Sequence, residues 1–251
     1  MRVTLRVAVL LCVVASALRP AWARDVLRVG ISPDPGVFAA LDVHRKIASG
    51  ATAEIFEAIA KDIGVDIEYV VVAGAGTNPY VAALNDGRID VIANTYQMTP
   101  DRRAQFDFSQ PVFSYGETIV VRKNDPGNYR TASDLRGLRV AVMAGSNYVD
   151  IAKRIGADPV VGGSLDGAVT SVDDGAVAAA MGAAPTLKFI VRHGACANVR
   201  TPAEYESHDV LPAGFGVRKG EAALLGKIDA ALSRLKADGT VAELLNRHGF
   251  D

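Results

Sequence analysis

The stretch DGRIDVIANTYQMTPDRRAQFDFSQP, residues 86–111, sets the pattern for the rest of the chain. Asp86 and Gly87 predict a tight turn, because glycine accepts the positive φ that such a turn needs, and the apolar residues after it predict a short strand. The uncharged sequence NTYQ, residues 94–97, then predicts a polar loop. In an open α/β sheet, ligands bind just beyond the carboxyl ends of the strands, which is where this loop would lie.

A helix start follows the loop and carries a pair of arginines. Thr99 provides a cap, and Pro100 occupies the first turn, where its missing N–H has no intrahelical partner to lose. Arg102 and Arg103 come next. An arginine placed there can bind a carboxylate through two parallel N–H···O bonds, although residue type alone predicts a solvated surface side chain.

Three features together resemble the signature of the family 3 extracytoplasmic solute-binding proteins, the polar amino-acid receptors of ABC importers. They are GRID at residues 87–90, Arg102, and the sequence FDFSQPVFSYGETIVVRK at residues 106–123. The resemblance covers residues 26–249 and is most specific in this block. It implies that Arg102 holds the α-carboxylate of the ligand. The other polar contacts of the first lobe would be Asn94, Thr95 and Gln97.

The resemblance also implies a fold, the type II periplasmic-binding-protein fold. In this fold two α/β lobes close on a ligand like a Venus flytrap and are joined by two crossing strands at the hinge. The expected division is a signal peptide (1–23), a first lobe (24–115 plus 215–251) and an inserted second lobe (116–214).

The first 23 residues are typical of a secretory signal peptide. Arg2 and Arg6 precede an apolar run of about 12 residues that ends at Leu18, and Ala21 and Ala23 are the small residues that a signal peptidase reads. A membrane-spanning helix needs ~20 apolar residues. We therefore expect cleavage and export to the periplasm, with an uncleaved membrane anchor as the alternative.

The cysteine content and the net charge bear on two questions, whether a disulfide forms and whether nucleic acid is a partner. Cleavage after Ala23 removes Cys12 and leaves Cys196 alone, so no intramolecular disulfide is expected. The chain has 27 basic and 28 acidic residues, and loss of the three arginines of the signal peptide changes the formal charge from −1 to −4. This acidic balance argues against a nucleic-acid partner.

Alternating strand and helix patterns predict the first α/β unit. Residues 26–31 and 66–72 have the composition of strands, and an amphipathic helix from Thr52, ended by Gly64, connects them. A second, shorter helix is expected after Asn78 as its cap, ending at the turn of residues 86–87.

The βα pattern starts again after Gly127, which predicts the second lobe. A strand over 138–143 precedes a turn and a helix over 148–155, and residues 210–217 predict the strand that returns to the first lobe. The segment after residue 221 predicts two closing helices, which by the resemblance pack on the first lobe.

Phe38 and the turn at residues 145–147 are candidate parts of the site. The resemblance implies an aromatic residue against the ligand in the loop after the first strand, where Phe38 is the only aromatic residue; a packing role is the alternative. Gly145, Ser146 and Asn147 resemble the loop of the second lobe, where backbone N–H groups at a helix N-terminus help to hold a carboxylate. There Gly145 would permit close approach and Ser146 would add a hydroxyl. An ordinary turn with Asn147 as a helix cap is the alternative.

Ala183 bears on the identity of the ligand. The segment DDGAVAAAMGAAPTLKFIVRH, residues 173–193, aligns without a gap on a family segment whose two acidic positions are Ala178 and Ala183 here. By the resemblance, Ala183 stands where an aspartate pairs with the α-ammonium group of an amino acid. An unpaired charge in a desolvated cleft is costly. We therefore expect a carboxylate without an α-ammonium group to be preferred, unless Asp34 or Glu117 compensates or an amino acid binds through carbonyls and hydroxyls alone.

Catalytic and metal-binding motifs were not found in the sequence. The four histidines have no metal-ligand spacing, no serine lies in a Gly-x-Ser-x-Gly elbow, and no phosphate-binding loop is present, so neither metal nor cofactor is expected. Cyclohexadienyl dehydratases, relatives with this fold, use a glutamate in the region that is MGAAP here, residues 181–185, which contains no acid.

We therefore expect a monomeric, non-enzymatic substrate-binding component of an ABC importer. It would capture a small carboxylate-bearing solute, an amino acid or a related organic acid, and deliver it to a permease in the inner membrane. The alternatives are a diffusible ligand-sensing partner of a signalling system and a cyclohexadienyl-dehydratase-like enzyme on the same fold.

Overall fold

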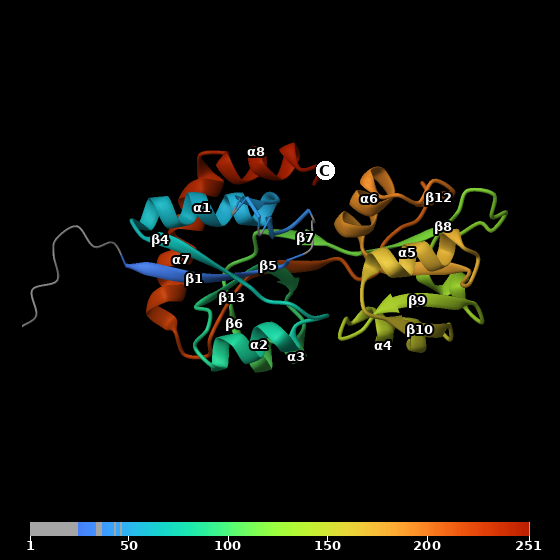
Figure 1. Cartoon of the computed structure of the whole chain (residues 1–251), viewed down its shortest axis with the longest axis horizontal. Coiled ribbons are helices and arrows are strands. Elements are labelled where there is room, and N and C mark those ends of the chain that lie inside the picture. Colours follow the sequence, from blue (N-terminus) through green and yellow to red (C-terminus); the bar gives the residue numbers. More distant parts are fainter. Residues whose placement is uncertain (1–24, 34–36, 43, 46, 251) are drawn as a thin grey trace, which may run out of the picture.

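The protein has two α/β lobes that lie side by side along its long axis (Figure 1). The computed structural model describes residues 25–33, 37–42, 44–45 and 47–250. The predicted signal peptide and Asp34 lie outside the described residues. Within these ranges, no helix has both the length and the apolar character needed to cross a membrane. The two-lobe α/β fold predicted from the sequence is confirmed.

A mixed sheet with the strand order β4-β1-β5-β13-β6 forms the centre of the first lobe. Its parallel part consists of β4 (Asp66–Val71), β1 (Val26–Ile31) and β5 (Val91–Gln97), and the carboxyl end of β1 points toward the second lobe (Figure 1). β13 (Leu211–Val217) runs antiparallel to β5, β6 (Asp107–Phe108) and β7 (Phe113–Tyr115). A small hairpin of β2 (Ala40–Asp42) and β3 (Ile47–Ser49) lies at its side.

Helices cover both faces of this sheet. One face carries α1 (Ala51–Ile63), α7 (Ala222–Ala237) and α8 (Thr240–Arg247), and the other carries α2 (Asn78–Asn85) and α3 (Pro100–Gln105) (Figure 1). α1 forms as predicted because Ile55, Phe56 and Ile59 share one buried face. The Phe56 ring meets Phe215 of β13 edge-on at 5.1 Å. The two closing helices pack on the first lobe, as expected.

The second lobe also has a central sheet with helices on both faces, and its strand order is β10-β9-β11-β8-β12. Its strands are β8 (Glu117–Arg122), β9 (Arg139–Met143), β10 (Asp158–Gly162), β11 (Ala179–Ala183) and β12 (Val199–Arg200). Strand side chains alternate between the faces: Ile119 and Val121 pack with α4 (Tyr148–Arg154) and the 3-10 helix η1 (Ala132–Leu135), whereas Val120 packs with α5 (Leu165–Asp173) and α6 (Ala184–His193).

Two segments cross between the lobes. In the first, β7 ends at Tyr115 and β8 begins at Glu117, so Gly116 alone separates strands of two different sheets. The second crossing is the segment between β12 and β13. A Cβ at Gly116 would lie 2.3 Å from Cβ of Ser207 in that segment, so position 116 requires glycine. The predicted limit between residues 214 and 215 falls inside β13, because Leu211 already pairs with Tyr115 of the first sheet.

The expectation of a loop at residues 94–97 was wrong. These residues form the carboxyl half of β5, because β13 pairs with them, Gly214 opposite Tyr96 and Ala213 opposite Gln97. A partner strand more than a hundred residues away extends the strand beyond the apolar run that the sequence shows. A smaller correction concerns α2, whose first residue is Asn78 and whose N-cap is Thr77.

Candidate ligand-binding site

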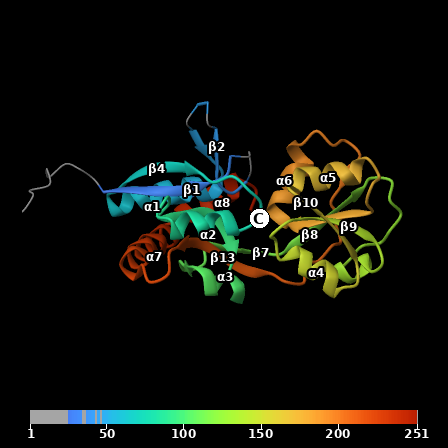
Figure 2. The same cartoon turned by 60° about the horizontal axis from the view of Figure 1, so that its bottom comes forward.

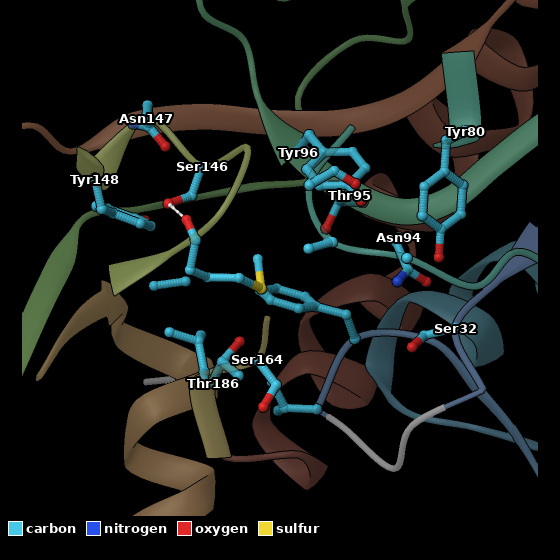
Figure 3. A pocket seen from close by; sticks show the side chains of 18 of the residues that line it. Ser32, Tyr80, Asn94, Thr95, Tyr96, Ser146, Asn147, Tyr148, Ser164 and Thr186 are labelled. Atoms are coloured by element: carbon cyan, nitrogen blue, oxygen red, sulfur yellow. Dashed lines mark hydrogen bonds between the residues drawn. The ribbon is translucent and has the colours of Figure 1, made fainter. Parts of the chain in front are cut away.

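A cavity of about 290 Å³ lies between the lobes (Figure 3). The first lobe lines it with loops after β1 and β4, with residues 94–96 of β5 and with Arg102 of α3. The second lobe lines it with the turns that follow β9 and β10 and with the junction of β11 and α6. The volume is just below the range of roughly 300–1,000 Å³ that is typical of small-molecule sites, so the cavity suits a small solute.

Arg102 is the most unusual residue of the cavity, because it is charged and only 7% exposed. Its Nη1 donates to the carbonyl oxygen of Gln97 at 3.1 Å, and its guanidinium carbon lies 5.1 Å from the centre of the Tyr96 ring. No carboxylate of the described residues pairs with Arg102. Among the described residues that line the cavity, Arg102 is the only cation. A buried charge without a counter-charge is costly, so this position favours an anionic ligand group.

Three buried polar atoms point to the same conclusion. The side-chain oxygens Asn94 Oδ1, Thr95 Oγ1 and the Tyr148 hydroxyl have no hydrogen-bond partner within the described chain, and all three residues line the cavity. Figure 3 shows Asn94 and Thr95 on the first-lobe side and Tyr148 on the second-lobe side. A buried polar atom that makes no hydrogen bond costs ~1–3 kcal/mol, so these atoms are placed to receive a polar ligand.

Gln97 is a hinge residue in this structure and does not line the cavity. Its Nε2 donates to the carbonyl oxygen of Tyr115 in the first crossing at 2.8 Å and to that of Asp209 in the second at 3.4 Å. Its Oε1 accepts from Nδ2 of Asn147 at 3.0 Å. The side chain therefore connects β5 to both crossings and to the second lobe. The sequence placed Gln97 beside the site but gave no indication of this role.

The predicted second-lobe turn lies at the cavity, with its polar side chains already engaged. The hydroxyl of Ser146 donates to the carbonyl oxygen of Met143 at 2.6 Å (Figure 3), and Asn147 donates to Gln97 as described. Gly145 does not line the cavity but touches Gly76 of the first lobe: a Cβ at Gly76 would lie 2.7 Å from the Gly145 oxygen. Its close approach is thus to protein backbone.

Phe38 lines the cavity and also packs in an aromatic cluster, so its contact with a ligand stays a prediction. Its ring centre is 5.5 Å from Tyr115, 5.7 Å from Phe250 and 5.9 Å from Phe113. The C-terminus lies where the two lobes meet in both views (Figure 1, Figure 2), which brings Phe250 to this cluster. The contacts with these three rings hold the Phe38 ring in place at the cavity.

Ala183 ends β11 and lines the cavity, as predicted. The possibility that Glu117 compensates for the missing carboxylate is not supported, because Glu117 does not line the cavity and is satisfied elsewhere. Its carboxylate accepts from the Tyr205 hydroxyl at 3.2 Å and from the backbone nitrogens of residues 208 and 209 at 2.9 and 3.4 Å. Among the described lining residues, the one carboxylate is Asp166 of α5.

Asp166 and the tyrosines of the cavity were missed by the sequence reasoning. The signal for Asp166 was the cap of α5, since the Ser164 side chain accepts from the backbone nitrogen of Gly167 and brings the first turn to the cavity. Burial raises the pKa of Tyr96 and Tyr148 well above the usual 10 and that of Tyr115 to about 12. These hydroxyls therefore stay protonated and can act as donors at neutral pH.

Comparisons with known proteins agree with this geometry. The sequence profile of the bacterial extracellular solute-binding proteins, family 3, matches residues 27–251. The amino-acid-binding protein AabA of Dichelobacter nodosus is 32% identical over 246 residues, which cover 94% of this chain and 93% of that protein. An ancestral arginine-binding protein, solved with arginine, is 30% identical with a TM-score of 0.77, covering 90% of this chain and 99% of that one.

A third comparison concerns enzymatic relatives. The structure of an ancestral amino acid-binding protein, described as a precursor of cyclohexadienyl dehydratase, is 26% identical with a TM-score of 0.77. The match covers 88% of this chain and 94% of that one.

Proposed function

The chain belongs to the bacterial extracellular solute-binding proteins of family 3, and we propose on this basis that its interlobe cavity binds a small carboxylate-bearing solute. It is the substrate-binding component of an importer. Export to the periplasm and delivery of the solute to an ABC permease in the inner membrane are parts of the same proposal. The solute is an amino acid or a related organic acid.

The observation that carries the proposal is the burial of Arg102 in a cavity that three unpaired buried oxygens, those of Asn94, Thr95 and Tyr148, also line. Arg102 supplies a charge that needs an anion, and its planar guanidinium matches the two oxygens of a carboxylate. Asn94 and Thr95 lie on the same lobe with free side-chain oxygens. Asn94 Oδ1 can only accept, so it suits an N–H or O–H group of the solute, whereas the Thr95 hydroxyl can also donate.

Closure of the lobes is the second part of the proposal. The lobes are connected by Gly116 on one side and by the segment between β12 and β13 on the other. Two such crossings allow hinge bending around a cavity that both lobes line. A solute that contacts both lobes favours the closed form by the difference between its affinities for the two forms.

No catalytic step is part of the proposal. The junction of β11 and α6, residues 181–185, contributes only Met, Gly, Ala and Pro side chains, none of which can transfer a proton. An assay of the purified protein with prephenate and arogenate tests this directly. Turnover of either compound above the background rate would contradict the non-enzymatic function.

Substitution of Arg102 tests the proposal, after a thermal-shift screen that identifies solutes for the wild type. The panel contains the standard L-amino acids, their deaminated and 2-oxo acid counterparts, and the corresponding amines without the carboxylate. A solute at 100 times its Kd raises stability by ~2.7 kcal/mol, which is easily detected. Calorimetry then gives Kd for the carboxylates that respond.

Arg102→Ala should weaken binding of such a carboxylate at least tenfold, since a hydrogen bond to a charged group contributes ~1.5–3 kcal/mol. Arg103→Ala is the matched control, because Arg103 is the exposed neighbour on the same helix and does not line the cavity. It should leave Kd unchanged. An unchanged Kd for Arg102→Ala would remove Arg102 from the site.

A further inference from the structure

Tyr148 has a buried hydroxyl without a partner in the described chain, and none of the expectations drawn from the sequence used it. It is the first residue of α4, only 5% of its surface is exposed, and it lines the cavity. Its ring packs in the core of the second lobe beside Ile151 and Tyr115. The ring is thus held by packing, while the hydroxyl at its tip lies at the cavity.

The polar side chains next to Tyr148 make their hydrogen bonds within the protein. Ser146 donates its hydroxyl hydrogen to Met143 at 2.6 Å, and Asn147 donates to Gln97 at 3.0 Å. Among Ser146, Asn147 and Tyr148, the tyrosine is therefore the one whose side-chain donor has no acceptor among the described residues. A tyrosine hydroxyl can donate one hydrogen bond and accept others.

Arg102 of the first lobe acts on the same hydroxyl. Its positive charge opposes the effect of burial on the pKa of Tyr148, and it does the same for Tyr96 and Tyr115. Arg102 of the first lobe and Tyr148 of the second line the same cavity from opposite lobes. Figure 3 shows Tyr148 on the side of the second lobe, across the cavity from Thr95 and Asn94.

We propose that the Tyr148 hydroxyl donates a hydrogen bond from the second lobe to the anionic group that Arg102 binds. The anion is then held by both lobes at once, and this contact makes closure depend on the carboxylate. The inference rests on the proposed function. It assigns Tyr148 a role in specificity, because a solute of the same shape without the carboxylate gains nothing from this hydroxyl.

Tyr148→Phe tests the inference, because it removes one oxygen atom and keeps the ring that packs in the core. The matched control is Tyr129→Phe, also in the second lobe, whose hydroxyl donates to Asp125 at 3.2 Å and does not line the cavity. Two sets of probes are used: L-arginine with 5-guanidinopentanoate and agmatine, and L-glutamine with 4-carbamoylbutanoate and 4-aminobutanamide. In each set the second compound lacks the α-amino group and the third lacks the carboxylate.

The carboxylate probes that bind the wild type, or the carboxylate from the full panel that binds most tightly, should bind Tyr148→Phe about tenfold more weakly. Tyr129→Phe should bind them like the wild type, and agmatine or 4-aminobutanamide should show no difference between the variants. The infrared stretching band of the ¹³C-labelled carboxylate of a bound probe should also shift between wild type and Tyr148→Phe, which a purely structural role of Tyr148 would not cause.

Two results would overturn the inference while the proposed function stands. One is a carboxylate that binds wild type and Tyr148→Phe with equal Kd. The other is an equal loss of affinity for the probes with and without the carboxylate, which would show that the tyrosine only shapes the cavity. If no carboxylate of the panel stabilises the wild type, the proposed function is itself refuted, and the role of Tyr148 is refuted with it.

Discussion

Gly76 and Gly145 touch across the cleft, and a methyl group at Gly76 should hold the lobes apart. Gly76 has φ +73°, and its carbonyl oxygen accepts from the Tyr96 hydroxyl at 3.0 Å, which fixes the loop. In Gly76→Ala the new Cβ would lie 2.7 Å from the oxygen of Gly145 and 2.9 Å from its Cα. Ordinary contact begins at 3.4 Å, so the lobes must separate by about 0.7 Å (3.4 minus 2.7) or the loops must deform.

The Gly76→Ala substitution has two free-energy costs, one from the backbone conformation and one from overpacking, and a control variant separates them. Alanine at positive φ costs ~1–2 kcal/mol in any state of the protein. Gly64 has the same φ, +73°, with nothing within 4 Å of a Cβ, so Gly64→Ala carries the backbone cost alone. The overpacking at Gly76 adds ~1–3 kcal/mol, but only when the lobes are closed. At 1.4 kcal/mol for each tenfold change, the additional loss of affinity is about 5- to 140-fold.

The assay is calorimetric titration of both variants with the carboxylate that stabilises the wild type most strongly, together with their unfolding free energies. Both variants should lose a similar amount of stability, whereas only Gly76→Ala should lose affinity. Small-angle scattering should show compaction of the wild type on binding and less compaction of Gly76→Ala. Equal Kd values for the two variants, or identical scattering profiles of the wild type with and without the solute, would refute the closure argument.

Three further predictions concern specificity, pH and the C-terminus. Ala183→Asp should improve binding of L-amino acids relative to their deaminated counterparts, and an unchanged preference in calorimetry would contradict the role inferred for this position. Folding stability should fall above pH 10, because burial raises the pKa of Tyr115 to about 12 and that of Tyr148 as well. The stability that these protonated tyrosines contribute is complete below the unfolded pKa of ~10 and is lost as pH rises through the folded pKa. Urea unfolding at pH 8 and 11 would detect this loss. Phe250→Ala removes a ring contact with Phe38 at 5.7 Å. It should weaken solute binding several-fold, since an aromatic pair contributes ~0.5–1.5 kcal/mol. Unchanged affinity would show that Phe38 does not need the Phe250 ring to hold its position.

The sequence by itself determined the elements whose signals are local. The apolar spacing of Ile55, Phe56 and Ile59 requires one buried helix face, and Gly64 ends that helix with a positive φ of 73°. Thr99 and Pro100 marked the start of α3, whereas the site role of Arg102 was implied only by the family resemblance of the surrounding block. Such signals are readable because periodicity, caps and turns depend on residues only a few positions apart.

Tertiary structure alone decided the features that depend on residues far apart in the chain. Residues 94–97 are a strand because β13 pairs with them, and Gln97 is a hinge residue because Asp209, 112 positions away, comes within 3.4 Å of it. The contact of Gly76 with Gly145, and the convergence of Arg102 and Tyr148 on one cavity, likewise join the two lobes. No local pattern encodes these contacts, since each depends on how two separately folded sheets are set against each other by the crossings at the hinge.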